Sequence, residues 1–281
     1  MTRERIELHR EQETMLMTLY LHARDAGSAH PILGDPYAAR VLERIDYDFG
    51  RFDKLAGNLP VIISRAKAID DITRSFLADH AEAVVLHLGC GLDSRVQRIN
   101  PDPSTAWFDI DQEPVINLRR KLVEDRIGVT TVAASVTQPY WWSAVPADRP
   151  TLILGEGLLM YLAPNDIRTL LDAALTRSRV AVQTLVFDTV APWVRRVSAW
   201  QPNFREASAK FLSTTNDLDA AIDRQDGVTL LAEQSMVSLA REAARGPLAT
   251  FISAMDALSF GHRAMVLRTY LHRPETPDLS R

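Results

Sequence analysis

Two glycines, Gly89 and Gly91, follow a run of apolar residues in the first half of the chain. The run covers residues 83–88 and reads Ala-Val-Val-Leu-His-Leu, which is typical of a strand buried in a parallel sheet. Glycine lets the backbone turn sharply and approach a ligand closely, so a strand followed by Gly-x-Gly and a helix can hold a nucleotide. Such a loop is also a common tight turn, and a nucleotide site needs further support from the chain.

That support comes from an acidic residue at the end of the next predicted strand. Asp111 follows Gly91 at the spacing at which a carboxylate accepts hydrogen bonds from both ribose hydroxyls. Asp109 competes for this role, and a solvated turn aspartate is the alternative for either residue. Ser94 stands where a dinucleotide fingerprint has its third glycine, which packs helix against strand beneath a pyrophosphate. S-adenosylmethionine has no pyrophosphate, so the loop favours this methyl donor over NAD.

Arg65 occupies an inward-facing position of a helix predicted to follow Pro60. Positions 62, 65, 69, 72 and 76 carry Ile, Arg, Ile, Ile and Phe, which form a single stripe on a helix. A buried guanidinium needs a partner, and the carboxylate of the donor's methionine part is a natural one. We therefore expect Arg65 to bind that carboxylate, and Arg65→Met to fold at least as stably without ligand. Pairing with a structural acid, or a place at the edge of the stripe, is the alternative.

Glu156 follows another apolar run, residues 151–154, and so lies at the carboxyl end of a strand. Ligands of open α/β sheets bind at that edge, where this carboxylate can accept a hydrogen bond from the donor's ammonium group. A helix N-terminal acid is the alternative. Ser135 and Val136 follow the predicted strand at residues 129–134, and by the same geometry they would flank the adenine.

Metal and covalent chemistry find no support among the remaining residues. The seven histidines form no close ligand pattern, Cys90 is the only cysteine, and no G-x-S-x-G or Walker A run occurs. A net charge of −4 argues against a nucleic-acid partner, and no apolar run is long enough to span a membrane. We expect a cytoplasmic protein without a metal. Trp141–Trp142 and Trp193/Trp200 are candidates either for an acceptor pocket or for plain packing.

The elements that must position these residues alternate between strands and helices. Apolar runs predict strands at 83–88, 107–110, 129–134, 151–154 and 179–187, and further strands at 228–234 and 263–271. This alternation predicts an α/β fold with a mostly parallel sheet and helices on both faces. We expect an N-terminal helical cap over residues 1–80, a core over 81–281, and an insertion at about 189–215 that breaks the alternation.

Two segments resemble signatures of a known family. Residues 88–95, Leu-Gly-Cys-Gly-Leu-Asp-Ser-Arg, look like the L-G-x-G-[LM]-D-[ST]-R motif of the leucine carboxyl methyltransferase/TcmP-like family. Residues 155–162, Gly-Glu-Gly-Leu-Leu-Met-Tyr-Leu, look like its A-E-G-[VL]-L-x-Y-L motif. The segments 35–38 and 45–49, and Phe187-Asp188, are also similar to TcmP-like members. One departure is that Pro114 comes one residue later than is common after Asp111.

The resemblance implies a class I, Rossmann-like methyltransferase that uses S-adenosyl-L-methionine. It implies transfer to a carboxyl or hydroxyl oxygen, and the similarity to TcmP-like members favours a small, polyketide-like acceptor. It also agrees with Arg65 as the partner of the donor's carboxylate. A protein C-terminal carboxyl methyltransferase, a donor-binding protein without turnover, and an NAD-dependent oxidoreductase remain as alternatives. No general base can be named, so the catalytic residues stay unknown.

Overall fold

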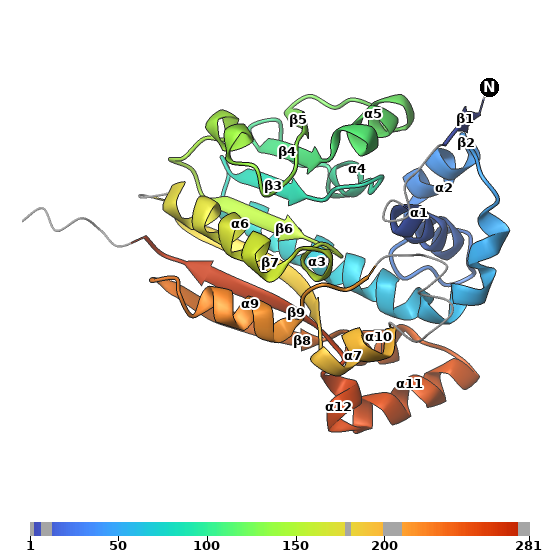
Figure 1. Ribbon diagram of the computed structural model, residues 1–281. Coiled ribbons are helices and arrows are strands. Elements are labelled where there is room, and N and C mark those ends of the chain that lie inside the picture. The colour runs from blue at the N-terminus through green and yellow to red at the C-terminus, as the bar shows by residue number, and fades with distance from the viewer. Residues whose placement is uncertain (1–2, 7–12, 178–180, 199–209, 275–281) are drawn as a thin grey trace, which may run out of the picture.

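A seven-stranded sheet runs through the centre of the molecule (Figure 1). The computed structural model describes residues 3–6, 13–177, 181–198 and 210–274. The strands are β3 (Val84–Leu88), β4 (Ala106–Asp111), β5 (Val129–Ala133), β6 (Thr151–Gly155), β7 (Gln183–Val190), β8 (Val228–Ser235) and β9 (Met265–His272). Their order is β5-β4-β3-β6-β7-β9-β8, in which β9 runs antiparallel to both neighbours and every other pairing is parallel. The predicted α/β fold with a mostly parallel sheet is confirmed.

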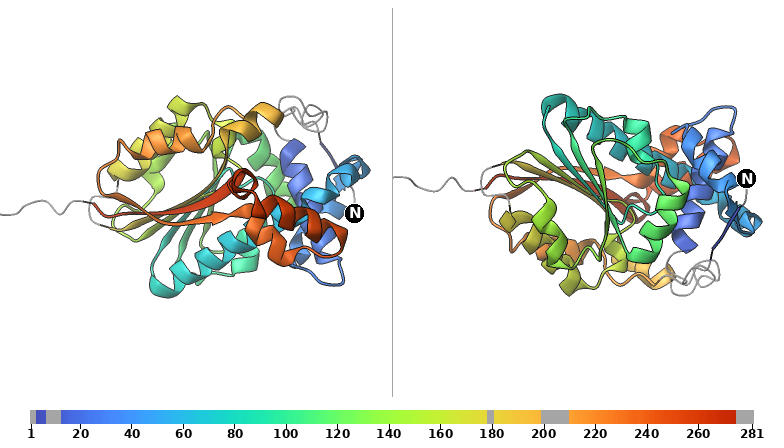
Figure 2. Two further views of the ribbon diagram at one scale, coloured as in Figure 1. Left: turned by 90° about the horizontal axis from the view of Figure 1, so that it is seen from below. Right: turned by 90° about the horizontal axis from the view of Figure 1, so that it is seen from above.

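The apolar strands are buried on both faces because helices cover each side of the sheet (Figure 2). In β3, Val84, Leu86 and Leu88 belong to one core cluster, whereas Val85 belongs to the other. The first cluster includes side chains of α6 (Pro164–Arg177) and α9 (Thr215–Ile222). The second includes side chains of α3 (Leu59–Asp79), α4 (Arg95–Ile99) and α10 (Met236–Ala243). Because successive side chains of a strand point to opposite faces of the sheet, each buried strand contributes to two separate cores.

The N-terminal elements lie beyond the carboxyl ends of the parallel strands (Figure 1). They are β1 (Glu4–Arg5), α1 (Glu13–Ala26), α2 (Pro36–Glu43), β2 (Ile45–Asp46) and η2 (Phe49–Asn58), with β1 and β2 paired in parallel. Four of the five positions of the predicted stripe on α3, Ile62, Arg65, Ile69 and Phe76, are buried, and Ile72 is half-buried against the same core as Ile69. Ile62 packs against Leu21 of α1, while Ile69 and Phe76 pack under the sheet. The helix α3 thus continues from the cap region into the core without a break.

The chain between β8 and β9 forms a layer of helices, in which a helix was expected from the sequence at about residues 247–259. It contains α10, α11 (Pro247–Ala257) and α12 (Ser259–His262), and α10 packs against α3. Because β8 runs in the same direction as β7, this layer lies at the same edge of the sheet as the N-terminal helices (Figure 1). The N-terminal helices and the helices α10 to α12, which are distant in sequence, therefore both lie at the carboxyl ends of the parallel strands.

The remaining elements connect the strands. They are α5 (Glu113–Leu122), η3 (Pro139–Ala144), η4 (Leu159–Tyr161) and α7 (Pro192–Ser198). The predicted insertion at 189–215 includes the end of β7, α7 and the start of α9, and its residues 199–209 lie outside the described part of the chain. The predicted start of the fifth strand at 179 likewise falls partly outside it. None of the described helices combines the length and the apolar content needed to cross a bilayer.

Candidate functional site

Gly89 and Gly91 shape the loop between β3 and α4. Their φ angles are +62° and +51°, in the left-handed region that favours glycine. The amide of Gly89 donates to the carbonyl of Ile110 at 2.8 Å, which holds the loop against the end of β4. A Cβ on Gly91 would lie 3.0 Å from Cγ of Met15, and one on Gly89 would lie 3.1 Å from Cδ1 of Leu158. Both positions therefore favour glycine for its conformation, and a Cβ at either would press against a neighbouring side chain.

Asp111 lies at the end of β4, beside this loop. Its Oδ2 accepts a hydrogen bond from the Gly91 amide at 2.8 Å, and its Oδ1 accepts one from the Gln112 amide at 2.7 Å. Burial raises the pKa of Asp111, because these backbone hydrogen bonds only partly offset the loss of water. The predicted spacing from Gly91 thus becomes a direct contact between the carboxylate and the loop.

Asp109, the rival for the ribose, is held by the interior of the protein. Its carboxylate accepts hydrogen bonds from Arg119 at 2.5 Å, from Trp107 Nε1 at 2.9 Å and from His87 Nδ1 at 3.2 Å. Burial alone would raise the pKa of Asp109, but the Arg119 guanidinium and His87 outweigh it and lower the pKa to about 2. Asp109 is only 1% exposed, so its contacts support the structure.

Arg65 and Glu156, predicted separately as donor-binding residues, contact each other. Nε of Arg65 donates to Oε1 of Glu156 at 2.8 Å, and Nη1 donates to Oδ2 of Asp188 at 2.9 Å. Two protein carboxylates therefore already flank the guanidinium without a ligand, as the alternative of a structural acid predicted. These partners lie 91 and 123 residues away in sequence. The local helix pattern that identified Arg65 could therefore not reveal them.

Asp188, at the end of β7, is a residue of this site to which the sequence analysis assigned no role. It is fully buried, and its Oδ1 accepts a hydrogen bond from the Gly157 amide at 2.6 Å. Burial raises the pKa of Asp188, although Arg65 opposes the shift. An acid at the carboxyl end of a buried strand, as for Glu156, was the signal that could have found it.

A second arginine holds the other oxygen of Glu156. Nη2 of Arg95 donates to Oε2 at 2.5 Å. Burial raises the pKa of Glu156, but Arg65 and Arg95 together outweigh burial and bring the pKa to about 2. Glu156 is therefore ionised and held at both oxygens.

The ion pairs continue from this centre into one buried network. Arg98 bonds to Asp70 of α3 at 2.9 Å and to Asp93 of the loop at 2.7 Å. The carboxylates of the network are Asp35, Asp70, Asp93, Glu156 and Asp188, and its guanidinium groups are Arg65, Arg95 and Arg98. Five buried carboxylates thus face three buried guanidinium groups, and the exposed Arg74 adds a fourth cation 3.8 Å from Asp70. Because the acids remain in excess, the network favours a further cation nearby.

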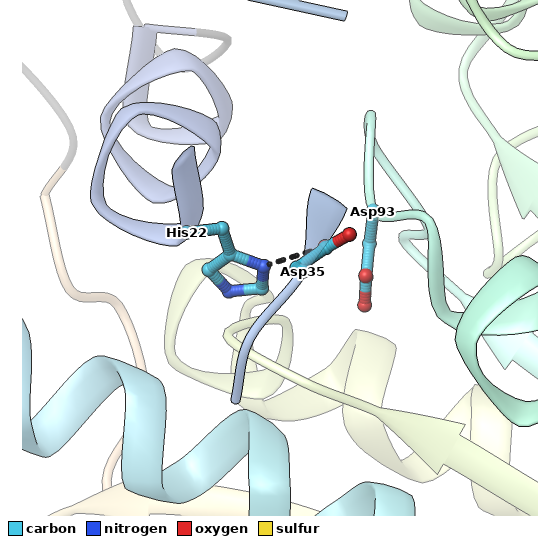
Figure 3. A group of neighbouring side chains, drawn as sticks. All are labelled: His22, Asp35 and Asp93. Atoms are coloured by element: carbon cyan, nitrogen blue, oxygen red, sulfur yellow. Dashed lines mark hydrogen bonds and ion pairs between the residues drawn. The ribbon is translucent and has the colours of Figure 1, made fainter. Parts of the chain in front are cut away.

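His22, Asp35 and Asp93 gather beside the loop with Asp35 in the middle (Figure 3). One ligand atom from each lies within 4.8 Å of the others, which would suit a metal ion. However, Nη1 of Arg98 donates to both carboxylates at 2.7 Å, and this guanidinium would repel a divalent cation. Asp35 also caps α2 and accepts a hydrogen bond from Ser94 at 2.6 Å. The group therefore joins the N-terminal helices to the loop.

Ser135 and Val136 lie just beyond β5, as predicted. Nε1 of Trp141 donates to the carbonyl of Ser135 at 3.2 Å, and the Trp141 and Trp142 rings stack with centroids 4.2 Å apart. Both rings belong to the core cluster that contains Val136, so the packing alternative holds for this pair. Trp193 contacts Phe260 of α12, whereas Trp200 lies outside the described residues.

Tyr161 is a further residue of this region to which no role was assigned from sequence. Its ring lies 5.6 Å from that of Phe211, at the end of the predicted insertion. Burial and the charge of Asp188 raise the pKa of Tyr161 to about 12, against the opposing effects of Arg65 and Thr14. Its hydroxyl is therefore neutral and able to donate a hydrogen bond at physiological pH.

We predict that Arg65→Met destabilises the protein without ligand by about 3–5 kcal/mol, because it leaves two carboxylates buried without their shared cation. Lys67→Met is the matched control on the same helix, since the Lys67–Asp71 pair is exposed, and it should change stability by no more than about 0.5 kcal/mol. Urea unfolding of both variants measures the difference. Equal effects would show that the buried pairs contribute nothing.

We predict that Asp109→Asn lowers stability by about 2–3 kcal/mol at pH 7. The folded-state pKa of Asp109 is depressed to about 2, so its contribution is present above the unfolded pKa and is lost as the pH falls toward 2. The gap between wild type and variant should therefore narrow below about pH 4. Asp111→Asn is the control, and its effect on stability at pH 7 should be smaller because the pKa of Asp111 is raised. A constant gap from pH 7 to pH 3 would contradict the assignment.

Two solved structures share this fold. A putative methyltransferase from Thermobifida fusca superimposes with a TM-score of 0.55 at 15% identity, covering 91% of this chain and 94% of that one. A DUF574 family protein from Streptomyces avermitilis superimposes with a TM-score of 0.57 at 11% identity, covering 94% of this chain and all of that one. At these identities the likeness concerns the fold alone.

Sequence comparison gives closer relatives. The chain is 34% identical over 266 residues to the tetracenomycin polyketide synthesis O-methyltransferase TcmP of Streptomyces glaucescens, covering 93% of this chain and 98% of that protein. It is 33% identical over 182 residues to the S-adenosyl-L-methionine-dependent methyltransferase dpfgK of Gibberella zeae, covering 59% of this chain and 61% of that protein. Residues 15–175 match the family model described as leucine carboxyl methyltransferase. The chain therefore belongs to the leucine carboxyl methyltransferase family and is an S-adenosyl-L-methionine-dependent methyltransferase.

Proposed function

We propose that this enzyme transfers a methyl group from S-adenosyl-L-methionine to a carboxyl or hydroxyl oxygen of a small, polyketide-like metabolite. The observation that carries the proposal is the ionised Glu156 beside the glycine loop, at the carboxyl edge of the sheet. The similarity to TcmP over nearly the whole of both chains supports the acceptor class and the oxygen target. We also propose that the enzyme is cytoplasmic and has no nucleic-acid partner.

The donor-binding roles are assigned residue by residue. The loop at Gly89 and Gly91 would pass under the donor, because its left-handed turn at the carboxyl end of β3 lets the backbone come close to a ligand. Asp111 would accept the two ribose hydroxyls, since the carboxylate of Asp109 is taken up by Arg119 and its other partners. Ser135 and Val136 would flank the adenine beyond β5, where Val136 is already buried among apolar side chains.

The charged end of the donor would meet Arg65 and Glu156. Each carboxylate oxygen of Glu156 accepts one arginine N–H, and each has a second lone pair that can accept from an ammonium group. Arg65 uses one N–H for Glu156 and one for Asp188, and a guanidinium has five N–H donors with which it can also bind a carboxylate. The donor carries one net positive charge, and the excess of acids in the network suits it.

The chain's own residues would align the acceptor and exclude water. S-adenosyl-L-methionine supplies, when bound, a methyl group activated by its sulfonium. Tyr161 lies close to Arg65 and Asp188, and its neutral hydroxyl can donate a hydrogen bond to an acceptor oxygen. The N-terminal helices and the segment around Phe211 would close over the acceptor. A carboxylate acceptor needs no general base, and no residue is assigned that role.

The proposal is tested with methyl-labelled donor and three acceptor sets: aromatic and polyketide-type carboxylic acids, the corresponding phenols, and peptides ending in a free carboxylate. We predict transfer to the small acids or phenols. Mild alkali releases labelled methanol from methyl esters but leaves aryl methyl ethers intact, which separates the two oxygen targets. Transfer only to the peptides would favour the protein carboxyl methyltransferase instead, and donor binding without any transfer would favour a protein without turnover.

We predict that Asp111→Ala weakens binding of S-adenosyl-L-homocysteine by about 1–3 kcal/mol, because the ribose loses charge-assisted hydrogen bonds. Calorimetry measures the affinity, and the wild type should show no binding of NAD. Asp109→Asn is the control: its amide oxygen can still accept from His87, and its loss of affinity should be smaller than that of Asp111→Ala once folding is verified. If the two variants rank the other way, the ribose assignment moves to Asp109.

A further inference from the structure

Arg95 follows the glycine loop as the first residue of α4, and its side chain is fully buried. We infer that Arg95 is a positioning residue that holds Glu156 in the orientation needed to recognise the ammonium group of the methyl donor. The inference rests on the proposed donor site and adds a residue that acts through Glu156. Arg95 would then contribute to recognition of the methyl donor without touching it.

All three nitrogens of the Arg95 guanidinium have partners from different elements. Nε donates to Oδ1 of Asp70 on α3 at 2.8 Å, and Nη1 donates to Nε2 of His87 on β3 at 3.3 Å. Nη2 donates to Oε2 of Glu156 after β6 at 2.5 Å and lies 3.3 Å from Oδ2 of Asp93. A planar fork held from several directions has little freedom to rotate. The core therefore fixes the position of the Arg95 N–H that bonds to Glu156.

The support behind Arg95 reaches across two neighbouring strands. Nδ1 of His87 faces Oδ1 of Asp109 at 3.2 Å, so a proton on Nδ1 is donated to the carboxylate and Nε2 is left to accept from Arg95. Asp109 is anchored in turn by Arg119. The chain Asp109–His87–Arg95–Glu156 links β4, β3 and the end of β6. This gives Asp109, the unsuccessful candidate for the ribose, a role behind the site.

Arg65 alone would orient Glu156 poorly. It is shared with Asp188, and it holds only Oε1 of Glu156. Without Arg95 the carboxylate could turn both oxygens toward Arg65, because a bidentate pair is the stronger arrangement. Each oxygen would still keep one free lone pair, but these lone pairs would turn with the carboxylate and would no longer face the ammonium group. With Arg95 in place each arginine takes one oxygen.

A purely structural role for Arg95 predicts a different outcome. In that case its loss would loosen the loop and α3 together, and would weaken every ligand of the donor site alike. A positioning role predicts a selective loss, confined to ligands that carry the ammonium group. The discriminating quantity is therefore a ratio of two affinities, measured on the same variant.

The experiment measures by calorimetry the affinities for S-adenosyl-L-homocysteine and for its analogue with hydroxyl in place of the α-ammonium. Wild type should prefer the ammonium ligand by about tenfold or more. Arg95→Lys keeps a charge but cannot span Asp70 and Glu156 as the fork does, and its preference should fall below about threefold. Arg95→Gln should behave in the same way, and it serves if Arg95→Lys does not fold.

Arg98→Lys is the matched control. Arg98 is buried in the same network and bonds to Asp35, Asp70 and Asp93, but Glu156 is not among these partners. Its variant should keep the wild-type preference even if both affinities decrease. A wild-type preference retained in the Arg95 variants, or no preference in wild type, would overturn the inference. Failure of wild type to bind either ligand would instead contradict the proposed donor site.

Discussion

The ionised carboxylate of Glu156, held between Arg65 and Arg95, is the interaction on which the arrangement of the site depends. It joins the helix α3, the loop after β3 and the end of β6, three segments that share no local sequence relation. Removing a carboxylate and two guanidinium groups from water is unfavourable unless their hydrogen bonds are satisfied. Here both oxygens have partners, and burial then strengthens the attraction because little water screens it.

The same network attaches the N-terminal helices to the core. Asp35 caps α2 through the amides of Tyr37 and Ala38, and it also accepts hydrogen bonds from Arg98 and Ser94 beside the glycine loop. One carboxylate therefore ends a helix, docks the cap region and contacts the loop. Since the donor is proposed to lie on this loop, the position of the cap and the shape of the donor site are set by shared contacts.

The two aspartates of β4 illustrate how position within a sheet separates residues of identical chemistry. Asp109 pairs in register with His87 and lies between helices and strands, where Arg119 neutralises it. Asp111 is the last residue of the strand, and it accepts hydrogen bonds from the backbone amides of Gly91 and Gln112. Arginine lowers the pKa of the first, whereas burial raises the pKa of the second. The same side chain therefore supports the structure at one position, and at the other it contacts the glycine loop on which the donor is proposed to lie.

The amino-acid sequence by itself determined the strands of the sheet, the helix α3 and the glycine loop, because apolar periodicity and left-handed glycines act over a few neighbouring residues. It also identified Arg65 by its place in an apolar stripe, and Glu156 and Asp111 by their places at the ends of strands. Only the tertiary structure decided their partners: Arg65 meets Glu156 and Asp188 across 91 and 123 residues. The layer of α10, α11 and α12 beside the cap was decided in the same way. Long-range contacts depend on how the strands are ordered in space, and no local pattern records that order.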